Sequence, residues 1–372
     1  MATWYAAANG DADAISWTEN ADGSGESRDW SSTEGEDMEA NNRTVSLPSG
    51  LTGFSRASLK TLNGGGFTVN TSAGNLAFTA NIVAGMTDCI VASGSGYTLT
   101  VTGNVTGGSS ANADGIQCNT AATVTVTGNV TGGSANPSNG INNNSTGTVT
   151  VNGTCTGGSS TNAEGLYNSS GVANISNAGN NACVGGSVAN ARGLWNISIG
   201  TATITGNVLA SDYTGSFGAN NGSTGTISVT GNVTGGNVAS GASPYGIRNH
   251  VAGTVNITGT LRGGVVAGVD FAGYAVYNRQ NTGTVNILAG SKLLFEAGRC
   301  PPVGGYVPLF DPAGTDYIQW AKTSEASQNF PLQLTAENVK DGVAHGTITG
   351  TYEGEGGGGG GPLIGASALI SG

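Results

Sequence analysis

Short runs in which threonine alternates with valine or leucine recur along most of this chain, and each run is followed by the same turns. TLTVTGNVTGG begins at Thr98, TVTVTGNVTGG at Thr123 and TVTVNGTCTGG at Thr148. Alternation with a period of two predicts strands with one buried face, while the Gly-Asn and Gly-Gly pairs predict turns. The unit returns about every 25 residues, which is typical of a solenoid whose coils bury apolar side chains against their neighbours.

We expect each coil to contain three short strands. In the coil that begins at Thr123, Val124 and Val126 alternate with threonines on the first strand, and Val130 points inward from the second. The loop SANPSN follows, and the third strand carries Ile141. Stacked coils bring equivalent inward positions into columns, one of which contains Val105, Val130, Cys155, Cys183, Val208, Val233 and Leu261.

Asparagine recurs two residues after the inward isoleucine or leucine of the third strand. A side chain two residues from an inward residue also points inward, and stacked amides can donate and accept hydrogen bonds between coils. We therefore expect a buried column that contains Asn143, Asn168, Asn196, Asn221, Asn249 and Asn278, with Cys118 at the preceding position.

This asparagine column resembles the asparagine ladders of right-handed parallel β-helices with the pectate-lyase-like fold. The resemblance covers roughly residues 78–290 and implies an architecture but no activity. The hexapeptide repeat of left-handed β-helices is absent from the sequence, which favours the right-handed form. The expected fold class is all-β: a single-stranded right-handed parallel β-helix, or solenoid, of about eight coils, with irregular N- and C-terminal caps.

The extent of the repeat divides the chain into four parts. Residues 1–70 are expected to form an N-terminal cap or docking segment, because a solenoid must cover its open ends. Residues 71–295 form the β-helix, and residues 296–355 form a C-terminal cap with a short β module. Residues 356–372 form a glycine-rich linker and an apolar tail. We expect four apolar residues of this tail to bind a partner during assembly: Leu363, Ile364, Leu369 and Ile370.

Charge is sparse and negative, with 12 lysines and arginines against 23 aspartates and glutamates and a formal net charge of −11. Because many of the acids precede residue 40 and the coils are nearly neutral, the chain lacks the basic stripe that a nucleic-acid partner needs. No apolar run approaches the length of a membrane span. The opening residues, MATWYAAANGDADAIS, lack the basic and apolar regions of a signal peptide, so we expect synthesis in a cytoplasm or export by another route.

The loop after each Gly-Gly pair varies most between coils, and the loops of a rigid scaffold often carry function. Aromatic and basic side chains gather there and on the outward face of the third strand. Aromatic rings beside polar groups suit sugar rings; the alternatives are a protein contact or ordinary exposed aromatics. The candidate ligand face contains Tyr167, Trp195, Tyr245, Arg248 and Tyr277.

Two acidic loop positions, Asp114 and Glu164, are candidates for a pair of catalytic carboxylates. They lie two coils apart, or about 10 Å at the spacing of neighbouring strands, which slightly exceeds the separation in inverting glycosidases. No cluster of further acids, histidines or lysines accompanies them, and no serine has the sequence of a nucleophile elbow. We therefore expect no catalytic residue, no cofactor and no bound metal; the aspartates near the N-terminus lack the spacing of an EF-hand.

Outward threonines form a further pattern. Thr98 and Thr100 stack below Thr123 and Thr125, so that a flat array of hydroxyl groups is expected. The array resembles the ice-binding face of other solenoids. The pattern changes to asparagine at Asn152, and outward threonine is also a good strand former, which is the simpler interpretation.

Near the C-terminus, NVKDGVAHGTITGT begins at Asn338. It resembles short modules that punctuate tail and other virion proteins of bacteriophages. Together with the rigid solenoid, the resemblance predicts a non-enzymatic structural component of a phage-like virion: a tail, fibre or capsid-surface protein that acts as a rod for display and attachment. The expected partners are other virion subunits, in a homo-oligomer, and a host-surface glycan. The alternatives are an extracellular adhesin, a tailspike-like β-helix that binds or depolymerises glycan and, with less support, an ice-binding protein.

Overall fold

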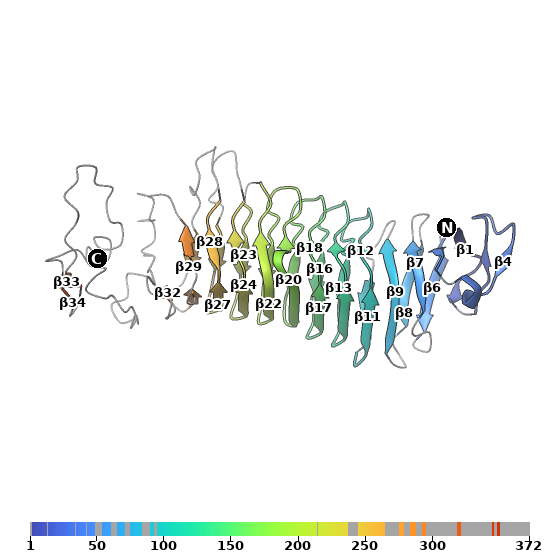
Figure 1. Cartoon of the computed structure of the whole chain (residues 1–372), viewed down its shortest axis with the longest axis horizontal. Helices are drawn as coiled ribbons and strands as arrows, with labels where there is room; N and C mark the ends of the chain where they lie inside the picture. The colour runs from blue at the N-terminus through green and yellow to red at the C-terminus, as the bar shows by residue number, and fades with distance from the viewer. Residues whose placement is uncertain are drawn as a thin grey trace.

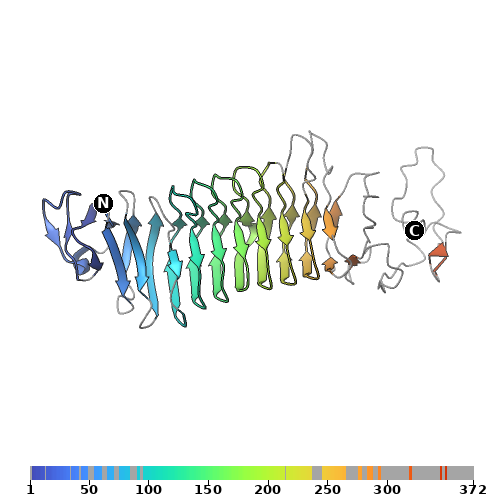
Figure 2. The same ribbon diagram turned by 180° about the vertical axis from the view of Figure 1, so that it is seen from behind.

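The computed structural model describes strands that follow one another along a rod, from the blue N-terminal end to the orange end in Figure 1, and Figure 2 shows the same order from behind. The described residues are 2–12, 14–33, 35–41, 43–48, 54–60, 65–70, 75–83, 90–92, 95–213, 215–236, 245–264, 275–278, 283–287, 292–294, 318–320, 344–345 and 348–349.

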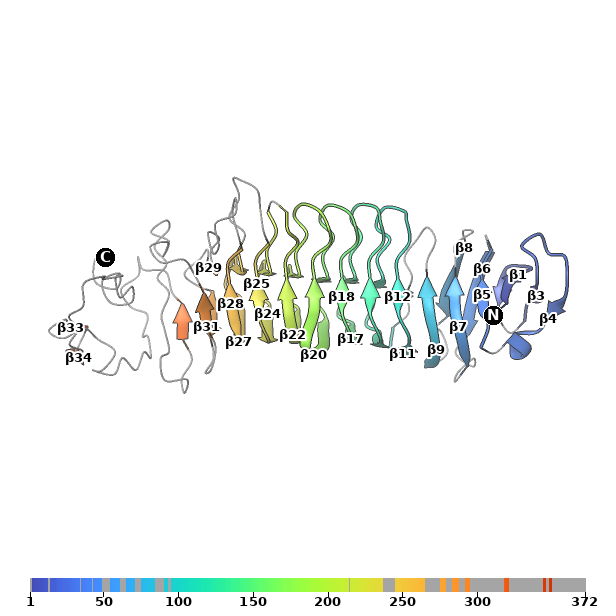
Figure 3. The same cartoon turned by 45° about the horizontal axis from the view of Figure 1, so that its top comes forward.

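One face of the rod is a 21-stranded sheet to which most coils contribute a longer strand and a short one. Neighbouring coils stack with their strands parallel (Figure 3). They pair in register, so that Thr98, Thr123 and Thr148 lie side by side. A kink at the Gly-Asn turn separates the two strands; Gly103 and Gly128 have φ values of 149° and 147°, which favour glycine. The first two strands expected in each coil therefore belong to one sheet.

Three coils join these strands into one continuous strand each, β9, β20 and β22. The strands of this sheet within the repeat are β9 (Leu76–Val83), β11 (Thr98–Thr102), β12 (Val105–Thr106), β14 (Thr123–Thr127), β15 (Val130–Thr131), β17 (Thr148–Asn152), β18 (Cys155–Thr156), β20 (Val172–Val184), β22 (Thr201–Leu209), β24 (Thr226–Thr230), β25 (Val233–Thr234), β27 (Thr254–Thr258), β28 (Thr260–Arg262), β30 (Thr284–Ile287) and β31 (Lys292–Leu294).

The other face is an 8-stranded parallel sheet with one short strand from each coil. Its strands are β10 (Ile90–Ala92), β13 (Ile116–Cys118), β16 (Ile141–Asn143), β19 (Leu166–Asn168), β21 (Leu194–Asn196), β23 (Ala219–Asn221), β26 (Ile247–Asn249) and β29 (Val276–Asn278). The described residues contain no α-helix, and η1 (Trp30–Thr33) is a single 3₁₀ turn. The predicted all-β solenoid of about eight coils is confirmed. Among these residues no helix is long and apolar enough to cross a membrane.

The core lies between the two sheets and repeats similar side chains in each coil. Val124 and Val130 from the large sheet and Ile141 from the small sheet are fully buried, as the alternation predicts. Burying such a side chain is worth about 1.5–3 kcal/mol, and each coil covers the apolar edge of the next. Cys155 and Cys183 pair in register in adjacent coils and are free thiols inside this core.

A continuous ladder of asparagine side chains runs through the small sheet. Nδ2 of Asn168 donates to Oδ1 of Asn196 at 3.0 Å and to the turn carbonyl of Gly171 at 3.1 Å. Asn196 repeats the arrangement with Asn221 at 3.1 Å and with Gly200 at 2.8 Å. The predicted inward column is confirmed for the side chains that the structure describes, all with 0% exposure: Asn143, Asn168, Asn196, Asn221 and Asn249.

The ladder starts at Asn143 because the preceding coil has Cys118 at the position in register with it. A thiol is a weak donor, and Sγ of Cys118 donates to the carbonyl oxygen of Thr120 at 3.4 Å instead. Oδ1 of Asn143 is consequently buried without a hydrogen-bond partner.

A second ladder, which periodicity alone did not predict, follows the exposed Gly-Asn turns of the large sheet. Oδ1 of Asn104 accepts the backbone N–H of Asn129 at 2.9 Å, and Oδ1 of Asn129 accepts that of Thr154 at 2.9 Å. The same contact joins Asn207 to Asn232 at 3.0 Å. The asparagine of the repeated TGNVTGG unit thus supplies a bond between coils.

The large sheet continues toward the N-terminus beyond the repeat. β9 pairs in parallel with β7 (Ser55–Lys60), β7 with β5 (Asp37–Glu39), and β5 with β1 (Thr3–Ala6). Trp17, Trp30, Phe54 and Phe78 follow one another through ring contacts of 5.4, 5.1 and 4.7 Å, so aromatic packing links the first residues to the first coils.

The remaining strands lie at the two ends of the chain. At the N-terminal end they are β2 (Gly10–Asp11), β3 (Trp17–Thr18), β4 (Ser27–Arg28), β6 (Arg43–Pro48) and β8 (Gly65–Asn70); at the C-terminal end they are β32 (Ile318–Trp320), β33 (Ala344–His345) and β34 (Ile348–Thr349). The last two form an antiparallel pair within the segment that begins at Asn338. The predicted assembly residues Leu363, Ile364, Leu369 and Ile370 lie outside the described residues.

Asn196→Leu is expected to lower the free energy of unfolding. The change removes two donated bonds and one accepted bond, and it leaves the amides of Asn168 and Asn221 without their partner, at a cost of about 1–3 kcal/mol for each unsatisfied group. Thermal and urea unfolding of this variant are compared with Asn152→Leu, whose side chain is exposed on the large sheet. Equal stability of the two variants would contradict a buried ladder.

Cys118→Asn is expected to raise the melting temperature, because an amide in register with Asn143 can donate to the unpartnered Oδ1 atom. Cys118→Ala is the control, since alanine also removes the thiol but donates nothing. Equal melting temperatures of the two variants would contradict the prediction, because they would mean that a donor to Oδ1 of Asn143 does not stabilise the fold.

Candidate functional site

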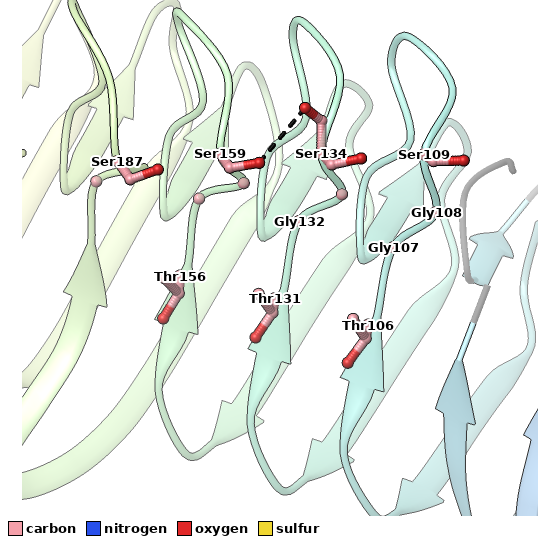
Figure 4. A pocket seen from close by; sticks show the side chains of 14 residues that line it. Thr106, Gly107, Gly108, Ser109, Thr131, Gly132, Ser134, Thr156, Ser159 and Ser187 are labelled. Atoms are coloured by element: carbon pink, nitrogen blue, oxygen red, sulfur yellow. Dashed lines mark hydrogen bonds between the residues drawn. The ribbon is translucent and has the colours of Figure 1, made fainter. Parts of the chain in front are cut away.

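A groove runs along the rod where the short strands of the large sheet enter the loops. β12, β15 and β18 each end in a Thr-Gly-Gly-Ser sequence, and these sequences stack to form a groove of about 530 Å³. Figure 4 shows its threonine side chains on successive strands and its serine side chains at the base of the loops. The hydroxyl groups come from Thr106, Thr131, Thr156, Ser109, Ser134, Ser159 and Ser187.

Contacts between coils keep the floor of this groove bare. A Cβ atom on Gly133 would clash with the carbonyl oxygen of Gly108, and one on Gly158 would clash with that of Gly133. Backbone N–H groups of the floor are already paired: N–H of Gly133 donates to the carbonyl of Ala113 at 2.9 Å, and N–H of Ser134 donates to that of Gly108 at 3.0 Å. Side-chain hydroxyls are therefore the main hydrogen-bond donors that the groove offers to a ligand.

The groove continues into a wider stretch of about 790 Å³, which shares Gly185 and Ser187 with the first. Asp212, Tyr213 and Arg262 line this wider part. The side chain of Tyr213 is 47% exposed and is one of only three large apolar side chains exposed in the described part of the chain. The site thus changes along the rod from uncharged hydroxyls to an aromatic ring with charged neighbours.

On the small-sheet side of the same loops, side chains contact one another from coil to coil. We call this set the outer band. It consists of the residues just before the third strand and those that face outward on it: Asp114, Asn139, Asn142, Glu164, Tyr167, Arg192, Trp195, Phe217, Tyr245, Arg248 and Tyr277.

The two candidate catalytic carboxylates are buried within the outer band. Asp114 is 1% exposed; it accepts the N–H of Asn139 at 2.6 Å and the side-chain amide of Asn142 at 2.7 Å. Glu164 is 2% exposed, and Arg192 donates to its Oε1 at 2.6 Å. Asn139 lies between the two acids and accepts the N–H of Glu164 at 2.9 Å. Both carboxylates thus bond to the following coils.

Glu164 combines burial with an ion pair. Burial raises the pKa of its carboxyl to about 7, although the Arg192 guanidinium acts to lower it. Burial and the nearby Glu164 carboxyl also raise the pKa of the Tyr167 phenol. Arg192 lies 4.1 Å from the ring of Trp195, which packs edge-on against Tyr167 at 5.4 Å. Arg192 therefore links the first half of the predicted ligand face, Tyr167 and Trp195, to the buried acid.

The second half of the predicted ligand face is a stack of rings. Tyr245 lies 5.2 Å from Phe217 and 4.9 Å from Tyr277, with both neighbours close to parallel to it, and Arg248 lies 5.5 Å from the ring of Phe217. Both faces of Tyr245 are occupied. A sugar that approached the outer band at Tyr245 would meet the edge and the hydroxyl group of this ring, and its faces would not be available.

The structure also places the other features noted in the sequence. The outward threonines of the large sheet are in register over several coils. Their columns are interrupted by Val172, which pairs with Thr148, and by Asn174, which pairs with Thr150. The described residues contain no group of three or more histidine, cysteine, aspartate or glutamate side chains that could hold a metal ion.

Sequence reasoning singled out seven of the eleven residues of the outer band but not their contacts, and it missed the groove and Tyr213. One available signal was complementarity between successive coils, since Glu164 is followed at the same position by Arg192 and Phe217 by Tyr245. In comparisons with protein-family models, with curated proteins and with solved structures, no match to this chain was found.

Glu164→Gln is expected to flatten the pH dependence of stability. Since the folded-state pKa of about 7 exceeds the ordinary value of 4.5, the folded protein binds this proton more tightly than the unfolded chain does. The resulting stabilisation is fully present below about pH 4.5 and is lost as the pH rises through about 7.

Urea unfolding of both proteins between pH 4 and pH 8 provides the measurement, and taking the difference at each pH cancels the other titrating groups. Wild type should gain stability relative to Glu164→Gln on acidification. Parallel curves would mean that Glu164 does not titrate in this window.

Proposed function

We propose that this chain is a non-enzymatic structural component of a phage-like virion, a rigid rod of a tail, fibre or capsid surface. The observation that carries the proposal is the side-chain bonding between coils at three places: the buried asparagine ladder, the ladder at the Gly-Asn turns and the outer band. Such bonding adds to the parallel backbone pairing and stiffens the stack. A stiff rod suits display at a distance from a particle.

The environment of the acids supports a non-enzymatic role. Residues 95–264 contain three carboxylates in the part that the structure describes, namely Asp114, Glu164 and Asp212. The first two are buried and bonded to neighbouring coils, whereas Asp212 lines the groove. A pair of acids for glycoside hydrolysis needs two carboxyl groups that face the same bound substrate.

The assignment to a virion rests on the segment that begins at Asn338 and resembles phage modules, part of which is the β33–β34 pair. On this proposal the partners are other virion subunits, including further copies of this chain, and the apolar tail contributes to assembly. The rod would carry its loops toward a host surface.

The alternative is an extracellular adhesin that binds glycan. It is favoured by a specific observation, the groove whose wider stretch is lined by the exposed ring of Tyr213. Both proposals use the solenoid as a scaffold and differ in what the rod is attached to.

Purified particles from a host that produces this chain are expected to contain it, as judged by mass spectrometry, and antibodies against residues 95–262 should label a projection. Removing residues 356–372 is expected to abolish incorporation while leaving the melting temperature of the isolated chain unchanged. Serine substitution of Leu363, Ile364, Leu369 and Ile370 is the matched variant that keeps the chain length. Recovery of the chain from the medium alone, with none in particles, would favour the adhesin.

No reducing sugar is expected to be released when the purified chain is incubated with bacterial polysaccharides, because Asp114 and Glu164 are bonded within the outer band. If the wild-type chain releases reducing sugar and either Asp212→Asn or Glu164→Gln does not, the non-enzymatic proposal is contradicted and the acid responsible is identified.

A further inference from the structure

We infer that the groove of the large-sheet side binds a neutral linear polysaccharide laid along the rod, with one sugar ring packed against Tyr213. This inference concerns the ligand of the displayed rod, and so it deepens the proposed function. The two contiguous stretches run from Thr106 to Arg262 over seven coils. At about 4.8 Å for each of six steps, they span about 29 Å, which is long enough for several sugar units.

The bonding of the groove floor favours a polyol over a peptide. An extended peptide binds a β-structure through free backbone groups. Here the N–H groups of Gly132, Gly157 and Gly185 donate to carbonyls of the next coil at 2.9 Å each. The hydroxyls of Thr131 and Thr156 make no hydrogen bond within the described part of the chain and face the groove. Hydroxyls donate and accept, as the groups of a sugar do.

The repeat of the groove matches a polymer. The same Thr-Gly-Gly-Ser arrangement returns in three successive coils of the narrow stretch and becomes Val-Gly-Gly-Ser in the fourth, so a chain of similar units would meet similar partners at most steps. None of the side chains that line this stretch is charged, which favours a neutral polymer over an acidic one.

Tyr213 supplies the aromatic platform that the outer band lacks. Its ring makes no contact with another ring among the described residues, whereas Tyr245 is stacked on both faces. At 47% exposure the ring is available to the apolar face of a sugar. Asp212 and Arg262 line the same stretch and can bond to the hydroxyls of that sugar.

Native affinity electrophoresis of the purified full-length chain tests the inference, with dextran, mannan and laminarin as neutral probes and polygalacturonate as the acidic one. At least one neutral polymer should retard the protein. The affinity for that polymer, read from the retardation, should weaken at least about tenfold in Tyr213→Ala. It should also fall in Thr131→Val, which removes a hydroxyl group from the groove but keeps a side chain of the same size.

Two controls match these variants in chemistry but lie outside the groove lining. Ile199→Ala removes the most exposed apolar side chain, at 66%, and Thr125→Val removes a hydroxyl from the flat part of the large sheet. Both should bind like wild type, and all four variants should melt like wild type.

Three results would overturn the inference: no retardation by any neutral probe, retardation by polygalacturonate alone, or equal binding by Tyr213→Ala, Thr131→Val and the controls. Because binding is measured on the isolated chain, the outcome is independent of the particle experiment. A chain that binds glycan but is absent from particles would remove the virion proposal and keep the groove.

Discussion

Equivalent residues of successive coils lie about 4.8 Å apart, and this spacing limits which side chains each position accepts. Identical amides satisfy one another at this distance, because each donates and accepts, as Asn168 and Asn196 do. Identical charges would repel. The constraint explains why the coils are nearly uncharged and why the column that contains Glu164 continues with Arg192 and not with a second acid.

Close stacking also shapes the surface that the rod presents. At Gly133 and Gly158 the carbonyl of the preceding coil occupies the space that a Cβ atom would need, so in the narrow stretch two glycines per coil form a bare floor. The groove is therefore a by-product of stacking along most of its length. Tyr213 is different, because stacking of the coils does not call for an aromatic ring that is 47% exposed. The wider stretch that this ring lines is therefore the part of the groove that says most about a ligand.

Much of the fold could be predicted because its signals are periodic. The burial of Val124 follows from alternation, and that of Asn196 follows from its distance to an inward residue. The burial of Glu164 could not be predicted in the same way, since it depends on how a loop of irregular sequence returns to the small sheet. The stacking of Tyr245 depends on two further coils, and Tyr213 lies in a coil whose loop sequence departs from that of the repeated unit.

In-register pairing also makes the whole coil the natural unit of change in length. Thr98 pairs with Thr123, and Thr123 pairs with Thr148, so a chain without residues 123–147 would bring two equivalent positions together and keep its core. Loss or gain of one residue within a strand would instead turn its inward side chains outward. Recombination between repeats can therefore adjust the reach of such a rod in steps of about 4.8 Å, while its cross-section stays constant.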